Sequence, residues 1–507
     1  MQRMEVIIRY VDDGDQVLSE SDMSFQMLDV DSIPREERLD QLESDTLDKG
    51  HEIMRLMFLS QCQLVDQQLA EKREHSDPNC RVQFDGDDPL KIASRLGILF
   101  LPRQVCYCET CHQHFMPLND WLPEHEGMIT TRGLQEWACL LPQELPFSTA
   151  QRLLGWVAKE PAVLSQTQLR TLIREHGGEI RQAEAAEVSE LSASKDLSEK
   201  TPNLVSLDTP RRHPAWPGEL HDTVEQALTE ESINPPEGIS QNDWDRVIAY
   251  QKQAKDEVEV SALSSLGPKV DDSQVVASVD GIQVRRPEKR RFHELRTAKV
   301  ITPKGYRYVS GTDASFPGYL LLLIRLCLPE DGFLTLLADG AHWIREFYVE
   351  CLHYIEHAEL ILDWYHLAKK KCKELCCMIA RGREAKDALL NSLKLKLWRG
   401  KVADAVSLLE AYRPHARNEK KLDELIVYLR KHQEEIPDYH QRRIHCQFNG
   451  SAHVEKANDL LVARRQKHKG MHWSLETSDS LCALKTLMLN HGWELYWQQR
   501  KVLPLAA

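Results

Sequence analysis

The sequence contains no long hydrophobic run, no signal-peptide pattern and no internal repeat. Its longest apolar stretch, residues 319–328, is interrupted by Arg325 and is too short to span a bilayer. Residues 1–9 have the pattern of a strand and lack the apolar core of a secretory signal. The thirteen cysteines are odd in number and mostly scattered inside helical or strand patterns, which is typical of a reducing compartment. We therefore expect a cytosolic protein that does not enter a membrane.

Positive charge is also scarce overall, since 64 Lys and Arg stand against 78 Asp and Glu and give a net charge of −14. Taken alone, this balance argues against a nucleic-acid-binding protein. The charge is unevenly spread, however: residues 12–90 are acidic, whereas residues 285–304, 369–373 and 464–469 form basic clusters. A local basic patch matters more than the net charge when the partner is a polyanion. The length of 507 residues predicts roughly two to four domains.

A cysteine-rich turn lies in the first predicted region, residues 1–125. Cys106, Cys108 and Cys111 follow a Cys-x-Cys-x-x-Cys pattern, and a Cys-x-x-Cys turn can present two thiolates to one tetrahedral zinc ion. A second pair that would close such a site is not obvious; the candidates are Cys80, His112, His114 and His125. Zinc binding and a redox-inert turn with spare thiols therefore remain alternatives.

Residues 126–182 have the pattern of short helices joined by a tight break. The last helix begins with a predicted capping box, in which Ser165 and Gln168 satisfy each other's backbone N–H groups. Two such helices fit a helix-turn-helix, whose second helix enters the major groove, and Arg170 and Arg174 would then face the DNA. A small helical bundle has the same pattern, so both interpretations stay open.

Ser, Glu, Lys, Pro and Thr dominate residues 183–270. Such a segment buries too little apolar surface to offset the entropy of ordering, so we expect a linker that is largely disordered. A region rich in strands and helices follows at residues 271–497, and residues 498–507 are predicted to be a short C-terminal tail.

The region 271–497 begins with three strands, a helix, a strand, a helix and a further strand, predicted at residues 275–284, 295–301, 306–311, 316–328, 334–338, 343–354 and 359–362. Asp280 lies inside or at the end of the first strand, and Asp339 directly follows the fourth. An acid at the C-terminal end of a buried strand is where α/β proteins tend to place ligands and metals. Each aspartate also precedes a glycine, and Asp-Gly is an ordinary turn as well.

This order resembles an RNase H-like domain. The expected fold class is therefore α/β, with an RNase H-like catalytic domain that carries an all-helical insertion and follows a mostly helical, DNA-binding N-terminal region. In such a domain the first strand neighbours the strand after the first helix, which would bring Asp280 and Asp339 together. Paired carboxylates hold Mg²⁺ through oxygen ligands, and two such ions would activate an attacking oxygen and stabilise the leaving one. A third acid should come from a later helix.

Four motifs between residues 275 and 497 connect the chain with a known family: Val279-Asp280-Gly281; Leu337-Ala-Asp339-Gly-Ala-His-Trp-Ile344; Leu362-Asp363-Trp-Tyr-His366; and Gly450-Ser-Ala-His-Val454-Glu455-Lys-Ala-Asn458, followed by a basic run to Trp473. This region resembles the DDE transposases of bacterial insertion sequences, closest to the ISKra/ISLre-type group. The resemblance implies that Asp280, Asp339 and Glu455 are the catalytic triad and the ligands of two Mg²⁺ ions. It also implies that Asp363 and His366 form an accessory Asp-x-x-His motif.

The same resemblance implies a substrate, an assembly and a location. The DNA of element ends and of a target site would be cut and joined. A homo-oligomer, a dimer or larger, is expected because two ends must be brought together. The enzyme would work in the bacterial cytoplasm, at the nucleoid.

The residues around Glu455 also have an interpretation of their own. Ser451 is a good helix N-cap, and Val454, Ala457 and Leu461 form an apolar stripe. Glu455 lies off that stripe with Asp459, one turn later, so an ordinary surface glutamate fits the pattern and Asp459 is a rival ligand. The family often has Gly-Ser-Gly before Val-Glu, whereas this chain has Gly-Ser-Ala-His, a departure that concerns the loop rather than the acid.

A helical insertion and a basic face complete the predicted domain. Helical periodicity across residues 370–445 predicts the insertion, which would also fit a helical subdomain covering the sheet edge. After Glu455, cations and one aromatic predict contacts with DNA phosphates and a base; these are Arg464, Arg465, Lys467, Lys469 and Trp473. A charge run of this kind is also compatible with a solvated helix face.

Three functions fit these patterns. The first is a metal-dependent DNA transposase, and the second is a transposase-derived DNA-binding regulator without catalytic activity. The third is a structural or partner-binding protein in which the acids only end strands. The presence of all three acids favours the first.

Overall fold

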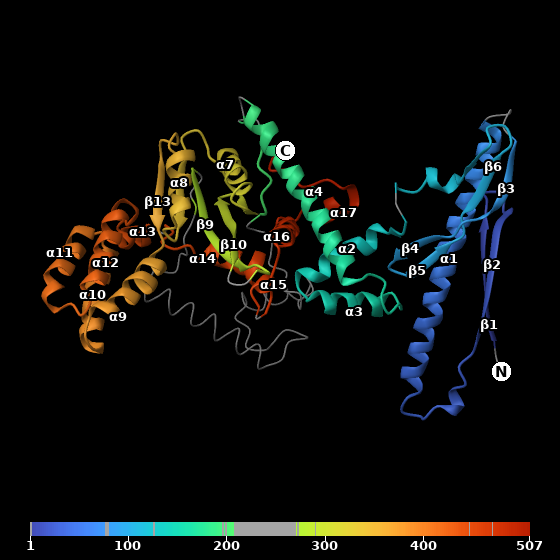
Figure 1. The fold of residues 1–507 in the computed structure, drawn as a ribbon, viewed down its shortest axis with the longest axis horizontal. Coiled ribbons are helices and arrows are strands. Elements are labelled where there is room, and N and C mark those ends of the chain that lie inside the picture. The colour runs from blue at the N-terminus through green and yellow to red at the C-terminus, as the bar shows by residue number, and fades with distance from the viewer. Residues whose placement is uncertain are drawn as a thin grey trace, which may run out of the picture. The chain divides into compact units, whose positions relative to one another are not determined.

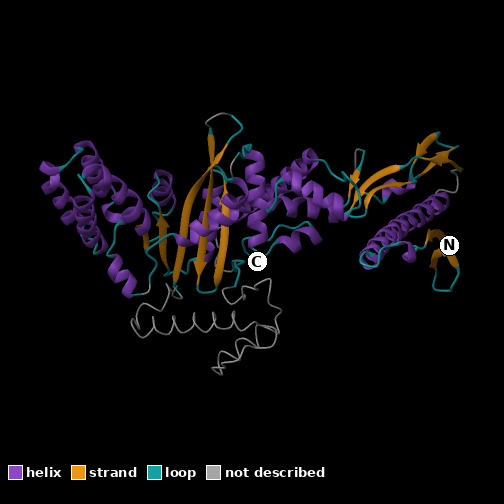
Figure 2. Cartoon of the chain, turned by 90° about the horizontal axis from the view of Figure 1, so that it is seen from below, coloured by secondary structure: helices purple, strands orange, loops and turns teal. Residues whose placement is uncertain are grey.

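The computed structural model describes residues 3–76, 81–124, 127–194, 197, 200–206, 270, 273–288, 291–445, 447–468 and 470–506. The chain forms two compact units, Met1–His176 and Gly177–Ala507, coloured blue to green and green to red in Figure 1. Helices and strands occur in both units (Figure 2), so the chain is a mixed α/β protein as predicted. Among the described residues, no helix combines the length and the apolarity needed to cross a bilayer.

The first unit is richer in strands than the sequence predicted. One long helix, α1 (Arg38–Ser76), accompanies three small sheets of described residues, which are β1 (Arg3–Val11) with β2 (Val17–Gln26); β3 (Val82–Asp87), β6 (Gln104–Cys108) and β7 (Gln113–Phe115); and β4 (Leu90–Ser94), β5 (Gly97–Leu101) and β8 (Ile129–Thr130). The prediction of a mostly helical region is therefore wrong for residues 1–125. Several of these strands have only two to six residues, too few for a clear alternating pattern.

Three helices follow in the chain: α2 (Arg132–Leu140), α3 (Phe147–Val157) and α4 (Gln166–Ala193). The predicted capping box of α4 is confirmed, since the Ser165 N–H donates to Gln168 Oε1 (2.8 Å) and the Gln168 N–H donates to Ser165 Oγ (3.2 Å). Because α4 continues to Ala193, the prediction of a linker is wrong for residues 183–193. Residues 207–269 of that predicted linker lie outside the described residues.

The second unit is built on a five-stranded sheet with the order β11-β10-β9-β12-β13; Figure 1 labels β9, β10 and β13 of this sheet. Its strands are β9 (Gln274–Arg285), β10 (Phe292–Thr302), β11 (Gly305–Gly311), β12 (Phe333–Ala338) and β13 (Ala358–Leu362). β10 is antiparallel to β9 and β11, whereas β12 is parallel to β9 and β13. The predicted order of elements is confirmed, and so is the predicted pairing of the first and fourth strands of this unit.

Apolar side chains cover both faces of this sheet, because successive residues of a strand point to opposite sides. Val275, Ala277 and Val279 of β9 belong to a buried cluster with α7 (Phe316–Cys327) and α8 (His342–Cys351). Val276 belongs to a second cluster with the helices that follow β13. Both faces are therefore occupied, and the ends of the parallel strands are the place where polar side chains gather.

The described elements between β13 and α14 are helical, as predicted for the insertion at residues 370–445. They are a π-helical turn (His366–Cys372), α9 (Lys373–Ile379), α10 (Arg383–Trp398), α11 (Val402–Tyr412), α12 (Glu419–Lys431) and α13 (Tyr439–Ile444), with short 3-10 turns between them. The chain then returns to the sheet, where α14 (Ala452–Asn458) packs against β9 and β10. It ends with α15 (Arg464–Gln466), α16 (Leu475–Leu489) and α17 (Trp493–Gln499).

The residues predicted as a C-terminal tail are packed into the second unit. Leu505 is buried in the same cluster as α7, and its N–H donates to Glu187 Oε1 (2.5 Å). Pro202 forms an isolated β-bridge with Ala506. The prediction of a separate tail at residues 498–507 is therefore wrong, because its apolar end completes the core.

Candidate active site

Three aspartates stand at one level across three neighbouring parallel strands. In the sheet, Ser278 pairs with Leu337, and these residues come two positions before Asp280 and Asp339. Ala338 pairs with Leu362, and these residues come directly before Asp339 and Asp363. Neighbouring strands are about 4.8 Å apart, so the three carboxyl groups occupy one edge of the sheet where β12 and β13 end.

Asp280 is half-buried and has two donors. The Gly281 N–H donates to its Oδ1 (2.7 Å), and the Asn458 amide donates to its Oδ2 (2.6 Å). Burial, followed by the negative charge of Asp339, raises the pKa of Asp280 to about 6, although the Gly281 N–H and the charges of His366 and Lys370 act in the opposite direction. Two carboxylates that repel each other in this way are matched to a cation.

Asp339 is held by the turn that follows β12. Its Oδ1 accepts a hydrogen bond from the Ala341 N–H (2.9 Å), and Gly340 between them has φ +88°. A Cβ atom at Gly340 would lie 2.9 Å from Cδ1 of Leu362. A glycine is therefore needed at position 340 for this turn.

Asp363 and His366 are in contact, as their predicted pairing requires. Asp363 is 2% exposed; its Oδ1 accepts from the His366 N–H (2.7 Å) and Nδ1 (2.9 Å), and its Oδ2 accepts from the Ser451 N–H (2.5 Å) and Oγ (3.0 Å). Burial alone would raise the pKa of Asp363, but the bonds from His366 and Ser451 lower it. Asp363 therefore ties β13 to the start of α14.

The second nitrogen of His366 faces a lysine that the sequence had placed only in a basic cluster. Lys370 Nζ lies 2.5 Å from His366 Nε2, and both charges act on Asp280. The hydrogen bond to Asp363 raises the pKa of His366. The site thus combines two repelling carboxylates with a nearby histidine and lysine.

On α14, the residue that contacts Asp280 is Asn458 rather than Glu455. Asn458 Oδ1 also accepts from the Thr297 hydroxyl (2.5 Å), in a buried bond to β10. Glu455 is exposed, and no hydrogen bond or ion pair of the described residues joins it to Asp280 or Asp339. Sequence reasoning missed Asn458, although its position one turn after Glu455 puts both residues on neighbouring parts of one helix face.

The rival acid Asp459 is held by surface cations. Its carboxylate accepts from Arg464 Nε (2.9 Å) and Lys456 Nζ (3.3 Å). Desolvation would raise the pKa of Asp459, but these two cations lower it. Asp459 is therefore paired with cations on the helix surface and does not contact Asp280 or Asp339 through any described hydrogen bond or ion pair.

The aspartate pair has the chemistry that Mg²⁺ prefers. The ion is usually bound through one or two carboxylates together with water and substrate phosphate, and Asp280 and Asp339 supply two carboxylates at one edge of the sheet. No group of three or more His, Cys, Asp or Glu side chains close enough to hold a metal occurs in the described part of the chain. Two carboxylates fit one Mg²⁺, and the predicted second ion stays a prediction.

Two residues of the predicted DNA-binding face are buried instead. Trp473 is 6% exposed and donates from Nε1 to the Gln466 carbonyl (3.1 Å). The guanidinium of Arg465, also 6% exposed, lies 4.7 Å from the Trp473 ring centroid. The prediction that Trp473 stacks on a base and that Arg465 binds a phosphate is wrong in this conformation, because the two side chains pack on each other.

The remaining residues of that face differ among themselves. Arg464 is exposed but paired with Asp459. Lys467 is exposed and lines a cavity with residues of β9 and β10. Lys469 lies outside the described residues.

In the first unit, the structure brings together two of the three predicted zinc ligands. The Cys111 N–H lies 3.4 Å from Cys108 Sγ, and a hydrogen bond with Cys108 raises the pKa of the Cys111 thiol. Cys106 and Cys108 are buried in β6, whereas Cys111 is exposed. Of the candidate closing ligands, His114 is paired with Asp85, and Cys80 and His125 lie outside the described residues. Zinc binding stays a prediction.

The two arginines of the predicted recognition helix lie on the surface of α4. Arg170 is exposed, and its guanidinium is 4.9 Å from the Phe147 ring centroid. Arg174 is half-buried, and its Nε donates to the Arg170 carbonyl (3.4 Å). Helices α3 and α4 are separated by residues 158–165, so the expected pair of helices is present and its contact with DNA stays a prediction.

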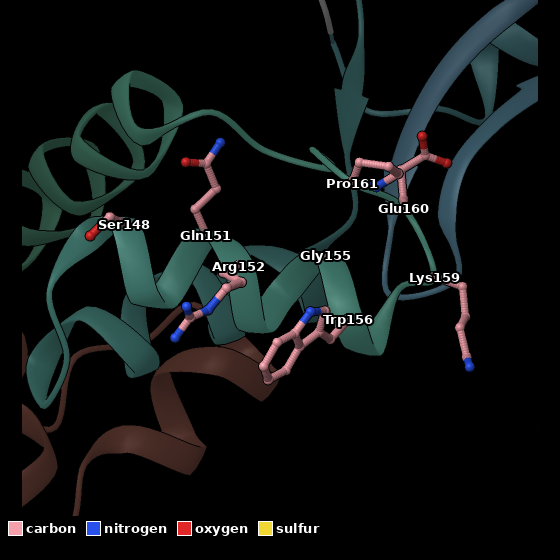
Figure 3. Close-up of a pocket in the computed structure, with 8 residues that line it drawn as sticks. All are labelled: Ser148, Gln151, Arg152, Gly155, Trp156, Lys159, Glu160 and Pro161. Atoms are coloured by element: carbon pink, nitrogen blue, oxygen red, sulfur yellow. The ribbon is translucent and has the colours of Figure 1, made fainter. Parts of the chain in front are cut away.

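An open cavity of 770 Å³ lies on α3 and the turn after it (Figure 3). Arg152 and Trp156 project to the same side of α3, and the guanidinium lies 5.2 Å from the ring centroid. Trp156 is 64% exposed, whereas Lys159 forms an ion pair with Asp48 (2.8 Å). All the residues that line this cavity belong to the first unit.

Comparison with models of known protein families gives no match to this chain, and comparison with curated proteins gives no significant match. Function must therefore be inferred from the residues themselves.

Proposed function

We propose that the chain is a DNA transposase that cuts element ends and joins them to target DNA by hydrolysis and transesterification. The observation that carries the proposal is the pair of Asp280 and Asp339 on neighbouring parallel strands. Burial, followed by the negative charge of Asp339, raises the pKa of Asp280 to about 6, and a perturbed carboxylate of this kind is typical of functional sites.

The strand order supports an RNase H-like catalytic domain. Three consecutive antiparallel strands are followed by two parallel strands reached through helices α7 and α8, and the order is β11-β10-β9-β12-β13. This arrangement puts an acid of the first strand beside an acid of the fourth. Fold alone does not give activity, so the proposal depends on these two side chains.

Each residue of the site has a proposed role. Asp280 and Asp339 would hold Mg²⁺, which when bound supplies Lewis-acid activation of water and of phosphate oxygens. Asn458 fixes the orientation of Asp280, and Asp363 fixes that of His366. Glu455 is the proposed third acid, and it must turn from solvent toward the pair when DNA binds.

The proposed chemistry exchanges one phosphodiester bond at a time. Water attacks the phosphorus at the element end, the bond to the leaving 3′ oxygen breaks, and that oxygen takes up a proton to become a free 3′-OH. This hydroxyl then attacks a target phosphodiester: its oxygen forms a bond to phosphorus, the bond to the target 3′ oxygen breaks, and that leaving oxygen takes up a proton in place of the one the attacking hydroxyl gives up. His366 and Lys370 place positive charge near Asp280, where the scissile phosphate would lie. Because two ends are joined, we propose that the active form is a homo-oligomer, acting on DNA at the bacterial nucleoid, with the first unit recognising the ends.

The proposal is tested by a nicking assay on the DNA that flanks the gene, with and without Mg²⁺. Asp280→Asn, Asp339→Asn and Glu455→Gln should each slow nicking by on the order of a hundredfold or more, while binding of the same DNA is retained. Asp459→Asn is the matched control, since Asp459 is paired on the surface, and it should nick like the parent. Unchanged nicking in Glu455→Gln would remove Glu455 from the site.

The exposed position of Glu455 favours one alternative, a transposase-derived DNA-binding regulator without catalytic activity. In that case the parent protein binds the flanking DNA but does not nick it at any Mg²⁺ concentration. The same assay therefore separates the two functions.

A further inference from the structure

Two basic clusters that are far apart in the sequence meet at one cavity of the second unit. Arg285, at the end of β9, and Lys467, just after α15, both line a cavity of 290 Å³. The N–H of Trp473 donates to the Arg285 carbonyl (2.9 Å), which fixes the segment after α15 to the C-terminal end of β9. The two cations are therefore held around one hollow by the backbone.

The cavity also has an apolar wall. Phe292, the first residue of β10, is 50% exposed, and the Arg285 guanidinium lies 6.0 Å from its ring centroid. Met471 lines the same cavity. An exposed aromatic face beside a cation is the combination that binds a nucleic-acid base together with its phosphate.

Nearby acids do not cancel this positive charge. Glu294 accepts from the Gln283 amide (2.9 Å) and is paired with Arg296 (3.6 Å). Glu288 is paired with Arg286 (3.3 Å). Arg285 and Lys467 are therefore the charges that face a ligand in the cavity.

We propose that this cavity binds one nucleotide of an unpaired DNA strand, with the base against Phe292 and Met471 and a phosphate between Arg285 and Lys467. A volume of 290 Å³ is at the small end of ligand pockets, so it fits one nucleotide rather than a longer segment. A base inside a duplex is stacked on its neighbours and cannot present its face to Phe292. The cavity therefore distinguishes unpaired from paired DNA.

The inference rests on the proposed function and gives it a further substrate contact. Arg285 follows Asp280 by five residues of β9, which corresponds to about 17 Å along an extended strand. The bound nucleotide would thus lie a few positions away from the bond that is cut. Opening of the duplex near the element end would be stabilised by this contact.

The test measures DNA binding by the full chain without divalent metal, so it does not depend on catalysis. The probes are a fluorescein-labelled oligothymidylate and a duplex of the same length, in EDTA over a series of NaCl concentrations. The variants are Phe292→Ala, Arg285→Gln and Lys467→Gln. The matched controls are Phe100→Ala, an aromatic on β5 that is 61% exposed, and Arg383→Gln on α10, whose side chain is 91% exposed.

Phe292→Ala should weaken oligothymidylate binding about tenfold, or ~1.4 kcal/mol, and leave its salt dependence unchanged. Arg285→Gln and Lys467→Gln should each lower the slope of log K against log salt by about 0.7, the value for one phosphate contact on a single strand. Duplex binding should not change in Phe292→Ala, and both control variants should behave like the parent.

Equal affinity of all three variants and the controls would overturn the proposal, and so would an equal loss of duplex binding in Phe292→Ala. Since Phe292 is half exposed, its replacement leaves the core intact. If the cavity variants lose single-strand binding while the parent never nicks DNA, the nucleotide site stands and the transposase proposal fails. If nicking is Mg²⁺-dependent but the cavity variants bind oligothymidylate like the parent, the transposase proposal stands and the nucleotide site fails.

Discussion

At the residue scale, the carboxyl of Asp280 couples stability to the proposed activity. Its pKa is about 6 in the folded chain because of burial and the charge of Asp339, whereas an unfolded aspartate has a pKa of about 3.9. A raised folded-state pKa contributes stability that is fully present below the unfolded pKa and is lost as pH rises through the folded pKa. The window for Asp280 therefore lies between about pH 4 and pH 6.

Asp280→Asn should change the free energy of unfolding of the metal-free protein in a pH-dependent way. The change should be more favourable at pH 7.5 than at pH 4 by about 2 kcal/mol. The measurement is denaturant unfolding of parent and variant at both pH values in EDTA. Added Mg²⁺ should raise the stability of the parent and not of the variant, because only the parent retains both carboxylates. Asp459→Asn is the control with the opposite sign, since the pKa of Asp459 is lowered. A gain that is the same at both pH values would contradict the raised pKa.

Asn458 is the residue that couples α14 to Asp280, and its replacement tests a positioning role. Asn458→Ala removes the donor to Asp280 and leaves the buried Thr297 hydroxyl without its acceptor, which should cost about 1–3 kcal/mol of stability. Nicking should slow about tenfold with unchanged DNA affinity, and the pH at which activity is half-maximal should rise, because the ionised form of Asp280 loses a donor.

As a control, Thr297→Ser keeps the hydroxyl that donates to Asn458 and removes only a methyl group. It should behave like the parent in stability, nicking and pH profile, which would show that the hydrogen bond matters rather than the packing of the methyl group. A pH profile identical to the parent in Asn458→Ala would show that Asn458 is only structural.

The sequence could predict some of these residues and not others. Val454, Ala457 and Leu461 are predicted to form one apolar stripe, and all three are buried, the first two in α14 and Leu461 in the π-helical turn (Asp459–Ala463) that follows it. Helical periodicity reveals such a stripe from hydrophobicity alone. Asn458 borders that stripe, but its contact with Asp280 depends on the helix rotation over the sheet. Trp473 was misassigned because a charge run does not reveal that Arg465 packs on it.

At the element scale, the turn after β12 controls the position of Asp339. Gly340→Ala puts a Cβ at φ +88° and 2.9 Å from Leu362, so backbone strain and a clash add together. We expect a loss of about 2–3 kcal/mol in the free energy of unfolding and a loss of Mg²⁺-dependent nicking as Asp339 moves.

Gly382→Ala provides the matched control for that variant. Gly382 has φ +80°, yet an added Cβ meets no atom within 4 Å. It should therefore cost only the backbone strain, about 1–2 kcal/mol, and leave nicking unchanged. Equal destabilisation of the two variants would show that the contact with Leu362 does not matter.

Elements of the second unit were more predictable than those of the first. The strands of the central sheet are apolar runs bounded by glycine and charged residues, and the insertion has helical periodicity, so both could be inferred. The strands β3 to β8 are short and their partners in the sheets are not all consecutive, as in the pairing of β3 with β6. Such pairings depend on contacts that a local pattern does not contain.

At the scale of the whole molecule, the boundary of the second unit lies far before the predicted start at residue 271. The Arg181 guanidinium donates to Asp479 (2.8 Å) and to the Ser310 carbonyl (2.8 Å). Val205 exchanges backbone hydrogen bonds with Tyr306. The sequence could not predict these contacts, because Arg181 and Asp479 are 298 residues apart and α4 looks like an ordinary amphipathic helix.

Arg181→Met tests this boundary in the full chain. Arg181 is nearly buried between Glu184 and Asp479, and both carboxylates raise its pKa. Its loss would leave two carboxylates without their cation, and the expected cost is about 3 kcal/mol. Arg181→Met with Asp479→Leu should recover part of that loss, because the buried charge opposite is also removed.

Two fragments of the chain test the same boundary without a substitution. A fragment of residues 177–507 keeps Arg181, the bond from Leu505 to Glu187 and the strand contact at Val205, so it should unfold in one cooperative thermal transition. A fragment of residues 271–507 exposes the apolar surface that α4 and the segment after it cover, and it should melt at least about 5 °C lower or aggregate. Equal melting temperatures would show that α4 is dispensable for the catalytic unit, and the boundary predicted from composition would then be the correct one.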